Sequence, residues 1–372
     1  MVYFKSLDAL RTIAALLVVL QHTMKGMGRY IKSDWGFLID AASEYGELAV
    51  QFFFVLSGFL VTFLLLKEQE NWGRISVMKF YFRRVLRIWP LFFIVLFIAI
   101  LIAPDYGAAK VENWWLYPSF LSNFDRLSLS ESNLMANITW SVAIEEQFYL
   151  FWPLIFLLKK PKHLLGLLCS LILISILFQL LYQADGAYFH TLTNLLFLAS
   201  GGILGLIISQ YQVPITRYVN QLTSKQLLLF ILLCCAFVVA HPYLFRNWVL
   251  LTNVFSALIF ALVILSQTLG NKYQLSRFTS LTKVGKYTYG IYLLHPIVLF
   301  FLPMTIIPKC LLWFRLKMGL SHDIGMALGF LSVLFFTLVM AMVSYHMIEK
   351  PMLKLKGKFY PKQMFTSAQV CA

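Results

Sequence analysis

The sequence is poor in charged residues, and acidic residues are especially few. Only 13% of its 372 residues are Asp, Glu, Lys or Arg, and only 16 residues are acidic, whereas an ordinary soluble domain has about 25% charged residues. This excludes two or three soluble domains, because too few polar side chains are present to cover their surfaces. Disorder is excluded as well, since 60% of the chain is apolar and 34 Phe, 18 Tyr and 9 Trp imply extensive burial.

Cysteine is also scarce, and the five cysteines show no recognisable pattern. Their number is odd and their spacing is not that of metal ligands, so we predict neither a disulfide framework nor a metal site. We interpret them as small apolar fillers. The first apolar stretch is not a cleavable signal peptide, because a histidine interrupts its core and no small-x-small cleavage site follows.

Long apolar runs are what the chain has in abundance. A helix that crosses a bilayer needs about 20 mostly apolar residues. Ten stretches approach this length: roughly 7–25, 47–66, 88–104, 138–158, 164–182, 191–209, 226–241, 248–269, 288–305 and 324–346. They do not alternate as the strands of a membrane β-barrel would. We therefore predict an all-α, polytopic membrane bundle of about ten transmembrane helices, with one transmembrane domain over 1–350 and a short basic cytoplasmic tail over 351–372.

Lys and Arg are divided unevenly between the two sides that ten spans define. The side with both termini has 22 of the 31 Lys and Arg residues, and the opposite side has 9. Because these residues accumulate in cytoplasmic loops, we predict that both termini are cytoplasmic. Orientation and contact with anionic lipid headgroups then explain the net charge of +15, and no nucleic-acid partner is expected.

A few ionisable residues fall inside the predicted spans, where each is a functional hypothesis because charge is unfavourable in hydrocarbon. In the first span Arg11 and His22 share one helix face, since eleven residues make about three turns, and a rise of 1.5 Å per residue separates them by roughly 16 Å. His22 is a candidate general base. An anchoring arginine and a hydrogen-bonded core histidine would give the same pattern, and the residues alone leave both interpretations open.

Two arginines, Arg84 and Arg87, share a helix face at the mouth of the third span. Guanidinium groups bind phosphate oxygens in pairs of parallel hydrogen bonds, so a phosphorylated donor on the cytoplasmic side is the candidate ligand. Positive-inside anchoring is the alternative. It explains Arg83 well and Arg87 less well, because aromatic and apolar residues follow Arg87 directly.

Two glutamates, Glu145 and Glu146, are the acidic residues that lie well inside a predicted span. Their side chains point about 100° apart on a helix. We predict Glu145 near the depth of His22, where a carboxylate can orient the imidazole and stabilise its charged form. A polar tether between helices is the alternative interpretation.

Two further segments are less informative. Ser57-Gly58 in the second span is a small pair that allows helices to approach closely, and we favour packing over a nucleophilic role for the serine because no base adjoins it in the sequence. His295-Pro296 interrupts the ninth span, where a proline kink can free backbone carbonyls around a cavity. For His295 we favour a hydrogen-bonded core histidine.

Taken together, these motifs resemble the integral-membrane acyltransferase-3 family, whose members are O-acyltransferases of bacterial surface glycans and some small natural products. The resemblance runs through nearly the whole chain, and five segments in the family's order make accidental agreement improbable. They are Leu7-Asp8-Ala9-Leu10-Arg11 with ten residues before His22, Phe53-Phe54-Val55-Leu56-Ser57-Gly58-Phe59-Leu60, Arg84-x-x-Arg87-Ile88-x-Pro90, Trp140-Ser141-x-x-x-Glu145-x-x-Phe148-Tyr149 and Ile348-Glu349-Lys350-Pro351.

The resemblance implies transfer of an acyl group from cytoplasmic acyl-CoA, acetyl-CoA by family default, to a hydroxyl of a glycan or lipid-linked saccharide at the bacterial inner membrane. It implies catalytic roles for His22 and Glu145, and donor-binding roles for Arg11, Arg84 and Arg87. We expect substrate-binding roles for Trp140, Ser141 and Tyr149, and structural roles for Asp8, Ser57, Gly58 and Glu349. Acyl-CoA is the expected co-substrate, membrane lipids surround the bundle, and neither a metal nor a permanently bound cofactor is expected. The chain resembles the stand-alone members, which lack a fused extracytoplasmic hydrolase-like domain.

Two questions stay open at the level of sequence. The acceptor hydroxyl can attack the thioester directly with His22 as base, or His22 can first become acylated. Two alternative functions remain: a non-catalytic lipid-binding or sensing protein, and a transporter or flippase for a lipid-linked glycan, which also needs polar groups in the membrane. Transporters often show repeated halves with broken helices, and we find no repeat in this sequence.

Overall fold

The computed structural model describes residues 4–28, 36–128, 133–156, 161–184, 186–244, 248–305 and 322–356, and these residues form helices without any strand. The long helices are α1 (Lys5–Gly28), α2 (Gly36–Trp72), α3 (Val77–Phe97), α6 (Thr139–Ile155), α7 (Pro161–Leu181), α8 (Thr191–Gln221), α9 (Ser224–Leu244), α10 (Val249–Leu269), α12 (Thr288–Thr305) and α14 (His322–Ser344). The short ones include η1 (Ile98–Ile102), α4 (Ser122–Asp125), η4 (Arg126–Ser128), α5 (Leu134–Asn137), η6 (Ala187–Phe189), α11 (Thr279–Val284), η8 (Gly285–Tyr287), η9 (Tyr345–Glu349) and α15 (Lys350–Lys356). The prediction of an all-α bundle is confirmed.

Eight helical stretches within the described residues are long and apolar enough to cross a membrane. The other two predicted spans are also helical, as α6 with 17 residues and α12 with 18. The number of ten spans and the cytoplasmic position of both termini stay predictions. Of the predicted basic tail, only the part within α15 lies inside the described residues.

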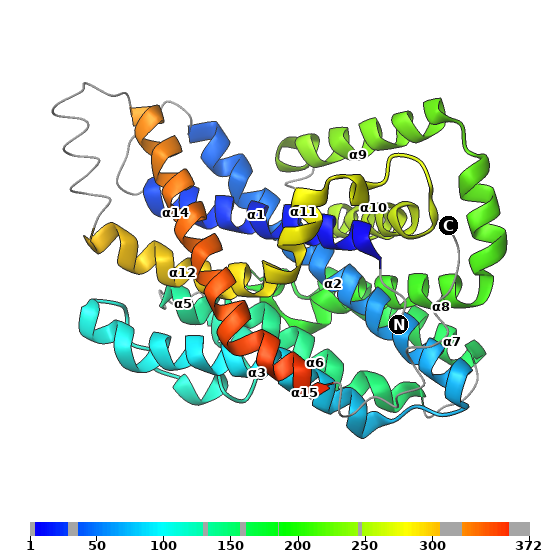
Figure 1. The fold of residues 1–372 in the computed structure, drawn as a ribbon, viewed down its shortest axis with the longest axis horizontal. Coiled ribbons are helices and arrows are strands. Elements are labelled where there is room, and N and C mark those ends of the chain that lie inside the picture. The colour runs from blue at the N-terminus through cyan, green and yellow to red at the C-terminus, as the bar shows by residue number, and fades with distance from the viewer. Residues whose placement is uncertain are drawn as a thin grey trace.

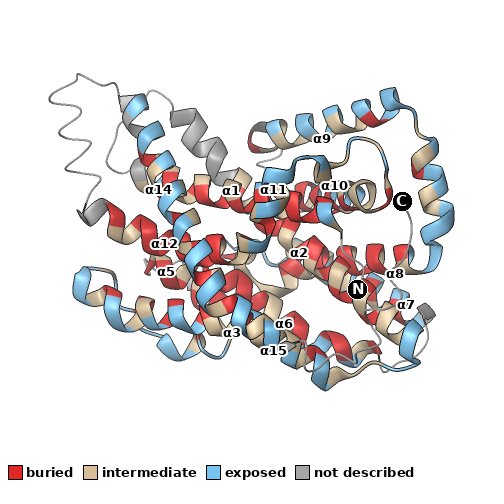
Figure 2. Ribbon diagram, viewed as in Figure 1, coloured by how far each residue is buried: buried red, intermediate tan, exposed pale blue. Residues whose placement is uncertain are grey.

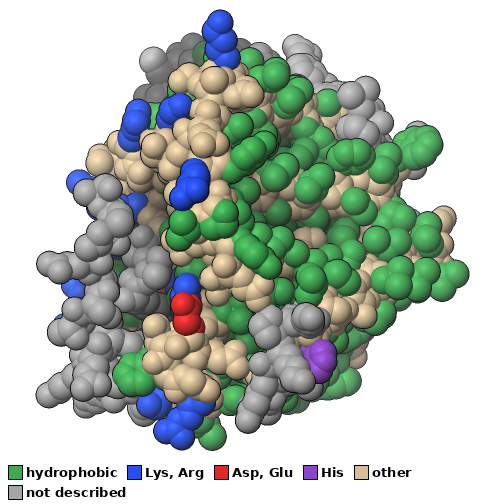
Figure 3. Space-filling view, turned by 90° about the vertical axis from the view of Figure 1, so that its right-hand side faces the viewer, with side chains coloured by type: hydrophobic (Ala, Val, Ile, Leu, Met, Phe, Trp, Pro, Cys, Tyr) green, Lys and Arg blue, Asp and Glu red, His purple; other side chains and the backbone are tan. Residues whose placement is uncertain are grey.

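The outer surface of the bundle is apolar, as expected for a protein in contact with lipid. Large hydrophobic side chains are exposed on several helices, among them Leu181 at 87%, Leu233 at 61% and Phe335 at 61%. Figure 2 shows the buried residues concentrated in the inner helices and the exposed ones on the periphery, where α9 lies. Figure 3 shows one broad hydrophobic face with Lys and Arg side chains gathered mainly along one edge. A surface of this kind is unfavourable in water and stable in a bilayer, so the chain is an integral membrane protein.

The centre of the bundle is α2, which packs against α8, α1 and α10 (Figure 1). Glycines bring α2 and α8 into backbone contact. A Cβ atom on Gly58 of α2 would lie 1.9 Å from the carbonyl oxygen of Leu198, and one on Gly201 of α8 would lie 1.9 Å from that of Val55. Small residues therefore permit this crossing, as at other close helix pairs in membranes.

Replacement of Gly201 by alanine is expected to destabilise the bundle, by about 3 kcal/mol or more, because the new methyl group overlaps backbone that side-chain rotation cannot move. Gly166 of α7 is the matched control, since a Cβ atom there would meet nothing within 4 Å. Thermal unfolding of the two variants in detergent, followed by size-exclusion chromatography, measures the difference. Equal midpoints for Gly201→Ala and Gly166→Ala would contradict the close approach.

Two local predictions differ from the structure. The third helix begins at Val77 rather than near 88, so it extends about three turns before the predicted apolar span. His295-Pro296 does not interrupt its span, because α12 continues through both residues. Proline removes one N–H from the helix and leaves the carbonyl four residues earlier without its usual partner, which is a smaller change than a break.

Candidate functional site

The first candidate site lies where α1 packs against α12, and two histidines form it. His22 is half-buried, and its Nδ1 lies 3.0 Å from the carbonyl oxygen of Val18, one turn earlier in α1. His295 of α12 is fully buried, and its Nε2 lies 3.3 Å from the same Nδ1 of His22. The ring centroids are 5.0 Å apart. We call these two residues the histidine pair.

The structure gives His295 a second contact beyond the core hydrogen bond expected from the sequence. Its Nδ1 lies 3.2 Å from the carbonyl oxygen of Ile291, as a satisfied core histidine would require. Its other nitrogen reaches His22, which is 273 residues away in the chain. The one signal for this contact in the sequence is that both apolar helices contain a single imidazole.

The second candidate site lies on α3, where it packs against α6 and η9. The Arg84 guanidinium stacks on Tyr149, with its carbon 4.5 Å from the ring centroid. Arg87, one turn later, is exposed and lies within electrostatic range of Arg11, Arg84 and Glu349. We call Arg84, Arg87 and Tyr149 the arginine group. The predicted donor-binding residues of α1 and α3 are thus brought to one region of the protein.

Arg11 has an anionic partner of its own. Its Nη1 lies 2.7 Å from Oδ1 of Asp8, whose side chain is almost completely buried. Asp8 also lies against Gly285 of η8, where an added Cβ atom would be 2.4 Å from the Asp8 Cβ. Asp8 therefore neutralises part of the Arg11 charge and fixes the beginning of α1 against the turn before α12.

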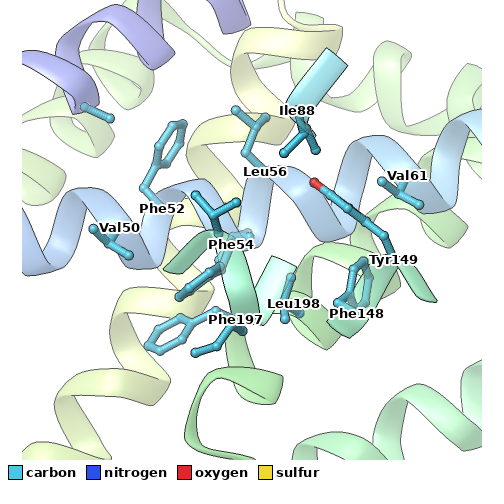
Figure 4. Close-up of a cluster of buried hydrophobic side chains, with 14 of the residues drawn as sticks. Val50, Phe52, Phe54, Leu56, Val61, Ile88, Phe148, Tyr149, Phe197 and Leu198 are labelled. Carbon is cyan, nitrogen blue, oxygen red and sulfur yellow. The ribbon is translucent and has the colours of Figure 1, made fainter. Parts of the chain in front are cut away.

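The carboxylate of Glu145 belongs to the arginine side. It accepts hydrogen bonds from Ser57 Oγ at 2.7 Å and from the Tyr149 hydroxyl at 3.2 Å, and Tyr149 also lies 3.2 Å from Ser57. Figure 4 shows Tyr149 among apolar side chains, with its hydroxyl directed towards α2. The hydrogen bonds described for His22 go to Val18 and His295, so the pairing of Glu145 with His22 expected from the sequence is not among the contacts seen. Tyr149, for which we expected a substrate-binding role, likewise lies beside the arginines.

The other two acidic residues near this region have separate partners. Glu146 accepts a hydrogen bond of 2.9 Å from the indole of Trp89, so the two glutamates do face different neighbours. Glu349 of η9 is buried, and Gly290 of α12 lies close to its Oε1. Its charge lies within range of Arg87, which gives this residue of the closing motif an electrostatic as well as a structural contact.

The remaining predicted substrate residues lie near the start of α6. Ser141 Oγ is 2.6 Å from the hydroxyl of Tyr292, whose ring centroid is 6.1 Å from that of His295. The Trp140 ring is 5.0 Å from the rings of both Tyr188 and Phe189. Trp140 is 7% exposed, so it offers little free surface. Ser141, through Tyr292, is therefore the one of the three that the structure brings towards the histidine pair.

Tyr188, which contacts Trp140 near the start of α6, is a titratable residue outside the predicted membrane spans. Burial raises the pKa of the Tyr188 phenol well above its ordinary value, and the charges of Glu47 and Tyr292 raise it further. Its hydroxyl therefore stays protonated and donates, at 3.5 Å, to the carbonyl of Glu47.

The described residues offer a general base and a group of guanidinium cations that can bind an anion. No group of three or more His, Cys, Asp or Glu residues there lies close enough to hold a metal ion. A half-buried imidazole near the far end of α1 can accept a proton, and guanidinium groups near its beginning can bind phosphate oxygens.

Comparisons with known proteins give one family and several relatives. The family described as "Acyltransferase domain" (Acyl_transf_3) matches residues 4–346. A Bacillus subtilis protein named "Putative peptidoglycan O-acetyltransferase YrhL" is 28% identical over 397 residues, which cover 98% of this chain and 57% of that protein. The peptidoglycan O-acetyltransferase OatA of Listeria monocytogenes is 28% identical over 342 residues, covering 84% of this chain and 52% of OatA. The chain thus spans a little over half the length of these relatives, and no solved structure matches it.

Proposed function

The chain belongs to the integral-membrane acyltransferase-3 family. We propose that it transfers an acyl group, by default acetyl, from cytoplasmic acyl-CoA to a hydroxyl of a glycan or lipid-linked saccharide. His22 is the general base, and Arg84, Arg87 and Arg11 bind the donor. The membrane is the bacterial inner membrane, with both termini in the cytoplasm.

The observation that supports this proposal is that a cationic group and a basic group, Arg11 and His22, lie along the same helix. Arg11 lies near the beginning of α1 and within electrostatic range of Arg87. His22 lies eleven residues later, about 16 Å along the helix axis. A donor whose phosphates are held at the arginines can extend its thin pantetheine arm along α1 and bring the thioester to the imidazole.

The reaction follows from these positions. His22 accepts the proton of the acceptor hydroxyl as its oxygen attacks the thioester carbonyl carbon. The carbon–sulfur bond then breaks, an ester forms, and the CoA thiolate leaves with the proton from His22. We propose His22 rather than His295 as the base because, of the histidine pair, only His22 is partly open to a substrate.

The acceptor is proposed from the relatives and from the α6 end of the site. The name of OatA says that it acts on peptidoglycan, and a glycan hydroxyl is the corresponding acceptor here. Ser141 and Tyr292 offer hydroxyl groups that can hydrogen-bond to a sugar near the histidine pair.

Release of thiol from acetyl-CoA by the purified protein tests the proposed function. We expect release to depend on soluble peptidoglycan fragments or another envelope glycan, and the acetyl group to appear on the glycan by mass spectrometry. No release with a panel of envelope glycans, together with movement of unmodified lipid-linked glycan across proteoliposomes, would contradict the enzyme and favour the transporter.

A further inference from the structure

The contacts of the histidine pair determine where its protons lie. A backbone carbonyl only accepts hydrogen bonds, so each imidazole nitrogen that faces one must bear a proton. His295 Nδ1 faces the Ile291 oxygen at 3.2 Å. The ring also interacts with the backbone of Tyr292, whose carbonyl lacks its usual helical N–H partner because Pro296 lies four residues later. In a neutral His295, the proton is therefore on Nδ1 and the lone pair is on Nε2.

The same reasoning applies to His22. Its Nδ1 lies 3.0 Å from the Val18 oxygen and must bear a proton. That N–H also faces His295 Nε2 at 3.3 Å, which has just been shown to carry a lone pair. The reverse arrangement, in which His295 Nε2 donates to His22, would place two lone pairs against two carbonyl oxygens. One assignment therefore satisfies all three contacts with both rings neutral.

We infer that His295 is a positioning residue, which accepts the hydrogen bond of His22 Nδ1–H and so directs the bare Nε2 of His22 towards the acceptor hydroxyl. This inference rests on the proposed function for its catalytic meaning. When His22 Nε2 takes the hydroxyl proton, the positive charge on its ring strengthens the hydrogen bond from Nδ1–H to His295. A fully buried neutral imidazole thus takes the place that a carboxylate has in a Ser-His-Asp triad.

Burial makes this arrangement specific to His295. Its side chain is 0% exposed and packs behind His22, so no water competes for its lone pair. Val18 supplies a second acceptor for the same hydrogen, but its oxygen is also the helical partner of the His22 N–H. His295 is thus the acceptor that ties the ring of His22 to another helix and fixes its direction.

Three substitutions test whether His295 acts as a hydrogen-bond acceptor or only fills space in the core. The amide oxygen of His295→Gln reaches the position of Nε2, that of His295→Asn is one methylene group shorter, and His295→Phe fills the space with no acceptor. We expect His295→Gln to keep kcat within about fivefold of wild type. The Asn and Phe variants should lose roughly 100-fold in kcat at unchanged KM for acetyl-CoA, less than the 10⁴-fold for a triad carboxylate because Val18 still holds the hydrogen.

A matched control is His346→Phe. His346 makes the same type of bond to the carbonyl four residues earlier, with Nδ1 2.8 Å from Met342, but it is exposed. We expect its kcat to equal that of wild type. Thermal midpoints of all four variants in detergent separate lost activity from lost folding. A fully active His295→Phe, or a His295→Gln no more active than His295→Asn, would overturn the positioning role.

Nitrogen NMR of the ¹⁵N-histidine-labelled protein tests the tautomer without any activity. The signals of His22 are identified by their loss in His22→Ala, and we expect a protonated Nδ1 and a bare Nε2. A protonated Nε2 in the wild type would overturn this inference and leave the proposed function standing. The expected tautomer together with an active His22→Ala variant would instead refute the proposed base while the hydrogen-bond assignment stands.

Discussion

Replacement of His22 by alanine is expected to reduce acyl transfer about 1,000-fold, in the range that loss of a general base causes, while the protein stays folded and inserted. The imidazole is half-buried, so truncation leaves a small space rather than an exposed core. Its two partners keep other contacts, since Val18 lies in a continuous helix and His295 still donates to Ile291. Thiol release from acetyl-CoA, normalised to monodisperse protein, measures the effect.

The control for this substitution is His163→Ala, which removes an exposed histidine near the beginning of α7. It should behave as wild type in both activity and thermal midpoint. If His22→Ala kept more than a tenth of the wild-type rate, the base would have to be another group. An inactive variant that also aggregates is repeated as His22→Gln, which keeps the polarity and approximate size of the side chain without a basic nitrogen.

Helix periodicity and the length of the apolar runs predicted most features that depend on one helix alone. The class of the fold, the placement of Arg11 and His22 on α1, and the pairing of Arg84 and Arg87 on α3 all follow from spacing within one helix. The early beginning of α3 was missed because its first turns contain Lys79 and the arginines, which interrupt the apolar run although they do not end the helix.

Contacts between helices were harder to predict, because they depend on how each helix is turned about its axis. On α6 a rotation of 100° exchanges the neighbours of Glu145 and Glu146. Other side chains fix that rotation: Trp152 donates to Thr62 on α2 at 2.9 Å, and Gln147 donates to Asn123 at 2.8 Å. Nothing in the local sequence of α6 specifies these partners.

The contact between His22 and His295 illustrates the same limit. The two residues are 273 positions apart, and each taken singly fits a hydrogen-bonded core histidine. They differ from two separate core histidines because α1 and α12 pack together and place the two rings at the same level along the helices. A sequence pattern within one helix has no information on that level, whereas the three-dimensional packing provides it directly.

Replacement of Arg87 by glutamine is expected to raise the KM for acetyl-CoA by about 100-fold with a smaller change in kcat, since a charge-assisted hydrogen bond contributes about 1.5–3 kcal/mol. Arg87 is exposed. Arg84 is stacked on Tyr149, and Arg11 is paired with Asp8. Among the described residues Arg87 has no ion pair within 4 Å, although Glu349 lies within electrostatic range. Its guanidinium is therefore the most available of the three for a phosphate.

An acyl donor without phosphates distinguishes a loss of donor recognition from a loss of folding. With S-acetyl-pantetheine, Arg87→Gln and wild type should have the same kcat/KM, because the arginine has nothing left to bind. Arg83→Gln is the matched control in the same helix: Arg83 is already paired with Glu68 at 2.8 Å, so its loss should leave the KM for acetyl-CoA unchanged. If Arg87→Gln reduced kcat/KM by the same factor with both donors, the substitution would act through the structure of the bundle. The arginine group would then not be the phosphate site.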